Sequence, residues 1–243
     1  MRNQAVLHVV FSFLFCFNGY VAVAQFQGGA YADLGMNNVS EGLFVRMAGN
    51  AAYQFDKNTL EVLFRTDLLG NREVFVSGYG LRVSREATIR TLPFKVTGFF
   101  VATPFSDILR ETNWGLTAGM QRNQWFFLLG TNFRTYAYNK KGIDRYGLEG
   151  NTRLRENWNL MYAVNYYFRP AGHSWNVMVG VTNADHFLIH QETNPMLQLQ
   201  GTYSIDPRFR LFMEAWYQQA GMFNINVHYF GFFIRPGIVW YIN

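Results

Sequence analysis

The sequence predicts an all-β fold, an antiparallel transmembrane β-barrel of about twelve strands. Two observations of composition lead to it. Aromatic residues make up 18% of the chain and charged residues only 15%, against roughly 25% charged residues in soluble domains. Beyond the N-terminal segment, no apolar run is long enough for a membrane-spanning helix. Because lipid cannot satisfy backbone N–H and C=O groups, a membrane protein without such helices must close its strands into a ring.

The N-terminal segment has the pattern of a secretory signal peptide. Arg2 gives a positive start, residues 5–17 form an apolar run, and Ala22-Val23-Ala24 offers a small-x-small cleavage pattern. The run is shorter than the roughly 18 residues that a membrane-spanning helix needs. We therefore expect a cleaved signal peptide at residues 1–24 and one barrel domain at residues 25–243. The single cysteine, Cys16, falls in the signal peptide, so neither disulfides nor thiolate metal sites are expected in the barrel.

The barrel domain alternates apolar and polar residues with a period of two, which is typical of strands with one face in lipid and one in a lumen. In residues 43–55, Leu43, Val45 and Met47 share one face, while Arg46 and Asn50 share the other. Similar runs recur along the chain. The predicted strands begin near Gly28, Leu43, Thr59, Glu73, Leu92, Thr112, Trp125, Asn157, Ser174, Met196, Phe209 and Val227. Ten or fourteen strands remain possible, because the runs from Glu73 and Leu92 alternate less cleanly.

Connection lengths and aromatic residues indicate the same fold. Short turns are expected at residues 56–58, 85–86, 122–124, 169–173 and 206–208, and longer loops at 103–111, 139–156, 183–195 and 219–226, with the short connection 69–73 as an exception. This asymmetry is typical of outer-membrane barrels. Two aromatic girdles are expected, one from Phe55, Trp125, Phe168, Trp175, Phe209 and Trp240 and the other from Trp114 and Trp158. A soluble β-sandwich would explain the alternation alone.

With these strands, turns and girdles, the chain resembles the outer-membrane β-barrels of Gram-negative bacteria over nearly its whole barrel domain. The resemblance is one of pattern and rests on no specific family motif. It implies a bacterial outer-membrane location, both termini in the periplasm, and contact with outer-membrane lipid and lipopolysaccharide. In that class the last strand usually ends in an aromatic residue, whereas here Trp240 and Tyr241 lie near the terminus without forming it.

The inward-facing positions are the candidate functional residues, because outward positions must be apolar. Seven basic residues fall on inward positions against Glu61, Asp67 and Glu214, and an Arg turned to mid-membrane lipid would cost roughly 2–4 kcal/mol. This excess predicts a narrow porin-like channel for small polar or anionic solutes. The predicted pore lining comprises Arg46, Glu61, Arg65, Arg82, Lys95, Arg134, Arg210, Glu214 and Arg235. A filled lumen, with the same groups paired to one another, is the other possibility.

Two further classes of function compete with the channel. A structural or accessory barrel would bind another envelope protein through its outer loops, and the basic loop 139–156 would meet lipopolysaccharide phosphates. Barrel enzymes carry His-x-Ser or Asp-x-His pairs, but here His173-Ser174 and Asp185-His186 are adjacent and would face opposite sides of a strand. No enzyme activity, cofactor or metal is therefore expected, although Asp185, His186, His190 and Glu192 form a weak candidate metal cluster. The mild charge excess, 21 Lys plus Arg against 16 Asp plus Glu, argues against nucleic acid.

Overall fold

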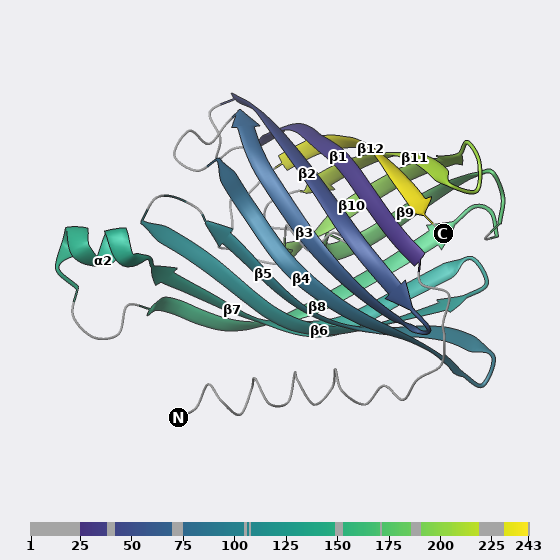
Figure 1. The fold of residues 1–243 in the computed structure, drawn as a ribbon, viewed down its shortest axis with the longest axis horizontal. Coiled ribbons are helices and arrows are strands. Elements are labelled where there is room, and N and C mark those ends of the chain that lie inside the picture. The colour runs from purple at the N-terminus through teal and green to yellow at the C-terminus, as the bar shows by residue number, and fades with distance from the viewer. Residues whose placement is uncertain are drawn as a thin grey trace.

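The computed structural model describes residues 25–37, 42–69, 75–104, 106, 108–148, 153–170, 172–185, 191–218 and 231–242, so the predicted signal peptide lies outside the described residues. Twelve antiparallel strands close into one barrel (Figure 1). Each strand pairs with its neighbours in sequence, and β1 closes the ring against β12. The strands are β1 Gln25–Asn37, β2 Gly42–Phe55, β3 Asn58–Leu69, β4 Val76–Ile89, β5 Leu92–Pro104, β6 Leu109–Arg122, β7 Trp125–Tyr138, β8 Arg153–Tyr167, β9 Trp175–Ala184, β10 Gln191–Ser204, β11 Phe209–Gln218 and β12 Gly231–Ile242. The predicted fold class and strand number are confirmed.

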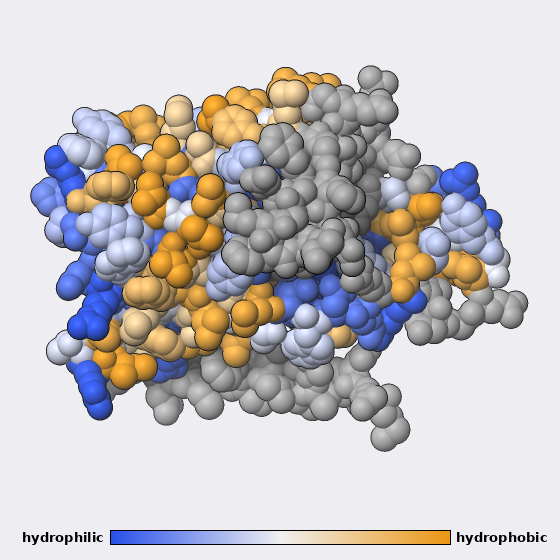
Figure 2. All heavy atoms as spheres, turned by 180° about the vertical axis from the view of Figure 1, so that it is seen from behind, coloured by the Kyte–Doolittle hydropathy of each residue, from blue (hydrophilic) through white to orange (hydrophobic). Residues whose placement is uncertain are grey.

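The period-two pattern assigns each residue to the lumen or to the exterior. On β3, Leu63 and Arg65 are buried inside the barrel, while Val62 and Phe64 are about half exposed on the outside. The same alternation places apolar side chains on the outside of the other strands. Figure 2 shows hydrophobic residues over much of the visible wall, with hydrophilic residues gathered along its left-hand end. In water such a band would be a large exposed apolar surface, and in a bilayer it faces the acyl chains.

Both predicted aromatic girdles are present. At one end, Phe100, Trp114, Phe133 and Trp158 are neighbours in register on β5, β6, β7 and β8. Their ring centroids lie 4.3 Å apart for Phe100 and Trp114 and 5.0 Å apart for Phe133 and Trp158. At the other end, the ring centroid of Trp125 lies 4.9 Å from that of Tyr166. Aromatic rings prefer the headgroup level, so the two girdles mark the edges of the membrane-spanning band.

The ends of the barrel differ, as expected. We call the end where β1 begins and β12 ends the short-turn end, and the opposite end the long-loop end (Figure 1). Tight turns at the short-turn end place Asp56, Arg90 and Asn123 in the left-handed region, with φ of 51°, 61° and 54°, which suits the twist of two-residue hairpins. The turn predicted at residues 85–86 was wrong. It lies further along the chain, because Glu86 continues the β4 ladder opposite Lys95 on β5.

At the long-loop end, several strands extend into predicted loops. β9 reaches Ala184 and β10 begins at Gln191, so the predicted loop 183–195 is shorter than expected. β6, β7 and β8 project together beyond the rest of the wall, and the short helix α2, Lys140–Tyr146, follows β7 (Figure 1). Asn139 caps α2 by accepting a hydrogen bond from the backbone N–H of Gly142 at 3.1 Å. Within the described part of the chain, no helix has the length and apolarity to cross a membrane.

The wall is least regular between β8 and β9, which pair only from Ala163↔Thr182 to Tyr167↔Met178. Beyond this point the side chain of Asn183 replaces the ladder. It accepts a hydrogen bond from the Tyr162 N–H at 2.8 Å and donates to the Leu160 carbonyl at 2.6 Å. Because an unsatisfied backbone group in lipid costs several kcal/mol, Asn183 keeps the two strands joined where their backbones separate.

Candidate functional site

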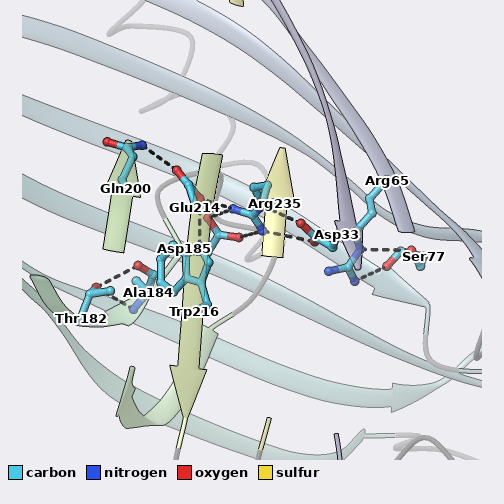
Figure 3. Close-up of polar contacts among 10 residues, drawn as sticks. All are labelled: Asp33, Arg65, Ser77, Thr182, Ala184, Asp185, Gln200, Glu214, Trp216 and Arg235. Carbon is cyan, nitrogen blue, oxygen red and sulfur yellow. Dashed lines mark hydrogen bonds and ion pairs between the residues drawn. The ribbon is translucent and has the colours of Figure 1, made fainter. Parts of the chain in front are cut away.

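The candidate site is the charged inner wall of the barrel, and its centre is Arg235 on β12. Five hydrogen bonds run from this guanidinium to three carboxylates (Figure 3). Asp33 on β1 accepts two of them, at 2.6 and 3.2 Å, and Asp185, directly after β9, accepts two at 2.8 and 2.6 Å. Glu214 on β11 accepts the fifth at 3.3 Å. The charge of Arg235 is therefore surrounded by carboxylates from three other parts of the wall.

Aromatic rings and amides complete what we call the Arg235 cluster. The guanidinium carbon lies 4.7 Å from the ring centroid of Tyr31 and 5.7 Å from that of Trp216, distances that allow cation–π attraction. The Trp216 indole N–H donates to Glu214 at 2.8 Å, and the Gln200 amide donates to the other Glu214 oxygen at 2.6 Å. Glu214 is 0% exposed, and Arg235 and Trp216 are each 1% exposed. The lumen is therefore filled with side chains at this level.

A small cavity beside the cluster confirms how tightly this part of the lumen is packed. Its volume is about 10 Å³, and Asp33, Arg46, Arg65, Met196 and Trp216 contribute to its lining. That volume is close to the minimum for one water molecule. Any solute that crosses the barrel has to displace side chains near Arg235 or pass through a wider state.

Two more polar groups lie on β2, β3 and β4. Arg46 pairs with Asp67 at 3.1 Å, and the neighbouring Arg65 donates to the Ser77 hydroxyl at 3.1 Å and to the Ser77 carbonyl at 3.0 Å. Nearer the short-turn end, Glu61 accepts hydrogen bonds from Arg82 at 2.8 Å and from Asn50 at 2.6 Å. The predicted register of β2 and β3 thus places Arg46, Arg65 and Glu61 inside, with polar partners on adjacent strands.

A fourth polar group lies on β6 and β7. Arg134 is 3.4 Å from Glu111 and donates to the Asn113 carbonyl oxygen at 3.2 Å. That oxygen also accepts a hydrogen bond from Asn132 at 2.8 Å, while the Asn113 amide donates to Glu111. Asn113, Asn132, Glu111 and Arg134 are all buried. Such fully connected polar networks stiffen an interior.

The last two predicted residues lie near the short-turn end, where the lumen is more accessible. Lys95 is 3.6 Å from Glu86, and both side chains are about half exposed. Arg210 is exposed and lies 5.8 Å from the ring centroid of Tyr241. Within the described residues, no carboxylate pairs with Arg210. All nine predicted residues face the interior, and their role in solute passage stays a prediction.

The predicted positive excess of the lumen was wrong. Sequence parity found three carboxylates, and the structure adds Asp33, Glu86, Glu111 and Asp185. Seven basic and seven acidic side chains therefore face the described interior. Asp33 lies on the inward face that also carries Tyr31, so its parity could have revealed it. Asp185 follows the end of β9, where parity no longer applies, and only the folded chain brings it to Arg235.

The weak candidate metal cluster falls largely outside the described residues. His186, His190 and the side chain of Glu192 lie outside them, and Asp185 bonds to Arg235. Among the residues that the structure describes, no group of three His, Cys, Asp or Glu side chains could hold a metal ion.

Comparisons with known proteins identify the fold of the chain, but they do not assign it to a family. No protein-family model matches the sequence, and no curated protein is similar to it at a significant level. Among solved structures, the chain is similar to a KdgM porin in complex with disordered oligogalacturonate, with a TM-score of 0.54 and 10% identity, covering 88% of this chain and 99% of the porin. A second structure of a KdgM porin has a TM-score of 0.51 at 10% identity and the same coverage. The outer membrane phospholipase A of Escherichia coli has a TM-score of 0.45 at 11% identity, covering 87% of this chain and 89% of the enzyme. The fold is that of outer-membrane β-barrels, and together with the apolar exterior it supports the predicted outer-membrane location.

Proposed function

We propose that the protein is a narrow porin-like channel for small polar solutes across the outer membrane. The observation that carries the proposal is the charged inner wall. It extends from Arg134 and Arg235, which lie nearer the long-loop end, to Lys95 and Arg210 at the short-turn end. A barrel that served only as a scaffold could fill its interior with apolar side chains at lower desolvation cost. The similarity to a porin of the same overall fold supports the proposal.

The charge balance bears on the solute class. The KdgM porin binds oligogalacturonate in its solved complex, and an anionic solute is one possibility for this chain. On the described part of the inner wall, equal numbers of acidic and basic groups, most of them paired, favour weak charge selectivity instead. We therefore propose small polar solutes in general, with little preference for anions. No catalytic step is part of the proposal, because the sequence lacks the His-x-Ser and Asp-x-His pairs of barrel enzymes.

Conductance in planar bilayers tests the proposal. Wild-type barrel should give small, discrete openings, with a reversal potential near zero in a KCl gradient. The Met196→Ala variant should conduct more, because Met196 is buried beside the Arg235 cluster and takes no part in its hydrogen bonds. Leu197→Ala is the matched control, since this neighbouring side chain is about half exposed on the outside. A folded barrel that conducts in neither form would contradict the channel and favour the accessory subunit.

A further inference from the structure

The outer wall of β6, β7 and β8 carries a second feature that the channel does not use. Arg110 on β6 lies opposite Ala137 on β7, and Arg153 on β8 lies opposite the same alanine from the other side. Since neighbouring strands are about 4.8 Å apart, the two arginine backbones are roughly 10 Å apart. Arg110 has the outward parity of Trp114, and a bulge between Tyr136 and Ala137 gives Arg153 the outward orientation of Ala137. Two guanidiniums therefore flank a small side chain on the lipid-facing surface.

The position of this pair along the membrane normal follows from the register. The aromatic row that contains Trp114, Phe133 and Trp158 lies four residues nearer the short-turn end on β6, a rise of roughly 13 Å along the strand. Strand tilt makes the height difference smaller. The aromatic row marks the edge of the apolar band nearer the long-loop end. Arg110 and Arg153 therefore lie at the level of the lipid headgroups on that side.

The surrounding charge is positive. Lys140, Lys141 and Arg145 on α2 are exposed directly beyond β7. The helix is held against the wall, because the Asn139 N–H donates to the Ile108 carbonyl at 2.8 Å. Two acidic residues oppose them, Asp144 on α2 and Glu156, which pairs with Arg153. Among the described residues of this region, five basic groups against two acidic ones leave a net charge of +3. Within the described residues, no carboxylate pairs with Arg110.

We infer that this face binds the phosphate groups of lipopolysaccharide in the outer leaflet, with Arg110 and Arg153 as the central contacts. Guanidiniums bind phosphate through paired, charge-assisted hydrogen bonds. The aromatic row below supplies a surface for the acyl chains of the same molecule, and the small Ala137 leaves room between the two arginines. A free phosphate would not use the aromatic row, and a zwitterionic headgroup would not need the positive excess. The inference does not depend on whether the lumen conducts.

The experiment measures the binding of lipid to the full barrel in neutral detergent, for example by native mass spectrometry. Wild-type protein should retain phosphorylated lipopolysaccharide. The Arg110→Ser, Arg153→Ser double variant should bind it more weakly, by about tenfold for each guanidinium–phosphate pair that is removed. Arg122→Ser is the matched control, because Arg122 is exposed at the opposite end of the same strand. Its affinity should stay within about twofold of wild type, a change well below that expected for one such pair.

Further probes separate the possible sources of the phosphate. Dephosphorylated lipopolysaccharide should bind wild-type and double-variant barrels equally weakly, which would support the inference. Equal retention of phosphatidylglycerol would overturn the assignment to lipopolysaccharide, and competition by millimolar inorganic phosphate alone would overturn the contribution of the aromatic row. The folding of the double variant is checked by the shift in electrophoretic mobility that heating causes in a folded barrel. A double variant that shows this shift and binds like the wild type would overturn the inference as a whole.

Discussion

Replacing Arg235 with alanine should strongly destabilise the barrel. The side chain is 1% exposed and donates five hydrogen bonds to Asp33, Asp185 and Glu214. Its removal leaves three carboxylates in the interior without their cation. Breaking a buried ion pair by deleting one partner costs about 3–5 kcal/mol. We expect a destabilisation in this range for Arg235→Ala. The loss of the cation–π attraction to Tyr31 and Trp216 contributes to it.

The free energy of unfolding can be measured by urea titration of the barrel in phospholipid vesicles, with tryptophan fluorescence as the signal. Arg210→Ala is the control, because Arg210 is exposed near the short-turn end and makes no ion pair among the described residues. Its effect should stay within about 0.5 kcal/mol. A destabilisation below about 1 kcal/mol for Arg235→Ala would refute the reasoning, since an uncompensated buried carboxylate alone costs more.

A compensated variant separates removal of the cation from removal of packing. Combining Arg235→Met with Asp33→Asn, Asp185→Asn and Glu214→Gln removes all four charges at similar volume. Replacement of a whole buried ion network by hydrophobic residues of similar volume is often neutral or stabilising, and neutral amides likewise remove the cost of burying charge. The combined variant should therefore recover much of the stability that Arg235→Ala loses. If it is as unstable as Arg235→Ala, shape and packing hold this region together, and electrostatic pairing does not.

Three further substitutions test the wall itself by the same unfolding assay. Gly130→Ala should destabilise by about 1–3 kcal/mol, because its Cβ would lie 2.4 Å from the Leu116 carbonyl oxygen, whereas Gly201→Ala meets nothing within 4 Å and should be nearly neutral. Leu129→Arg, on the outside of β7, should cost about 2–4 kcal/mol if that face lies in lipid, and no cost would contradict the assigned parity. Asn183→Ala should cost about 1–3 kcal/mol per backbone group left unsatisfied, and faster hydrogen exchange at Tyr162 would identify the cause.

The sequence was sufficient for the features that depend on strand parity. A period of two is local, so Arg65 and Glu61 could be placed inside and Phe64 outside without knowledge of any neighbour. The cost of a charged group in lipid makes this assignment strict. The girdles follow from the same parity together with strand length, which is why Trp114 and Trp158 were assigned correctly to one edge.

Strand ends could not be predicted as well. Glu86 extends β4 past the expected turn because Lys95 lies opposite it, and Gln191 extends β10 into the expected loop. A ladder ends where its partner ends, and the partner belongs to another part of the chain. The helix after Asn139 was missed for a different reason, since seven residues are too few for a clear helical period.

By itself, then, the amino-acid order determined a barrel of about twelve strands, the face on which side chains in the regular parts of the strands lie, and the two aromatic edges. The tertiary structure decided which inward charges meet. Arg235 binds Asp33 across 202 residues of sequence and Asp185 across 50, because ring closure sets β12 beside β1 and because Asp185, directly after β9, turns toward Arg235. Parity assigns a charge to the interior, but whether that charge stays available to a solute depends on a carboxylate that only the closed ring brings within hydrogen-bonding distance.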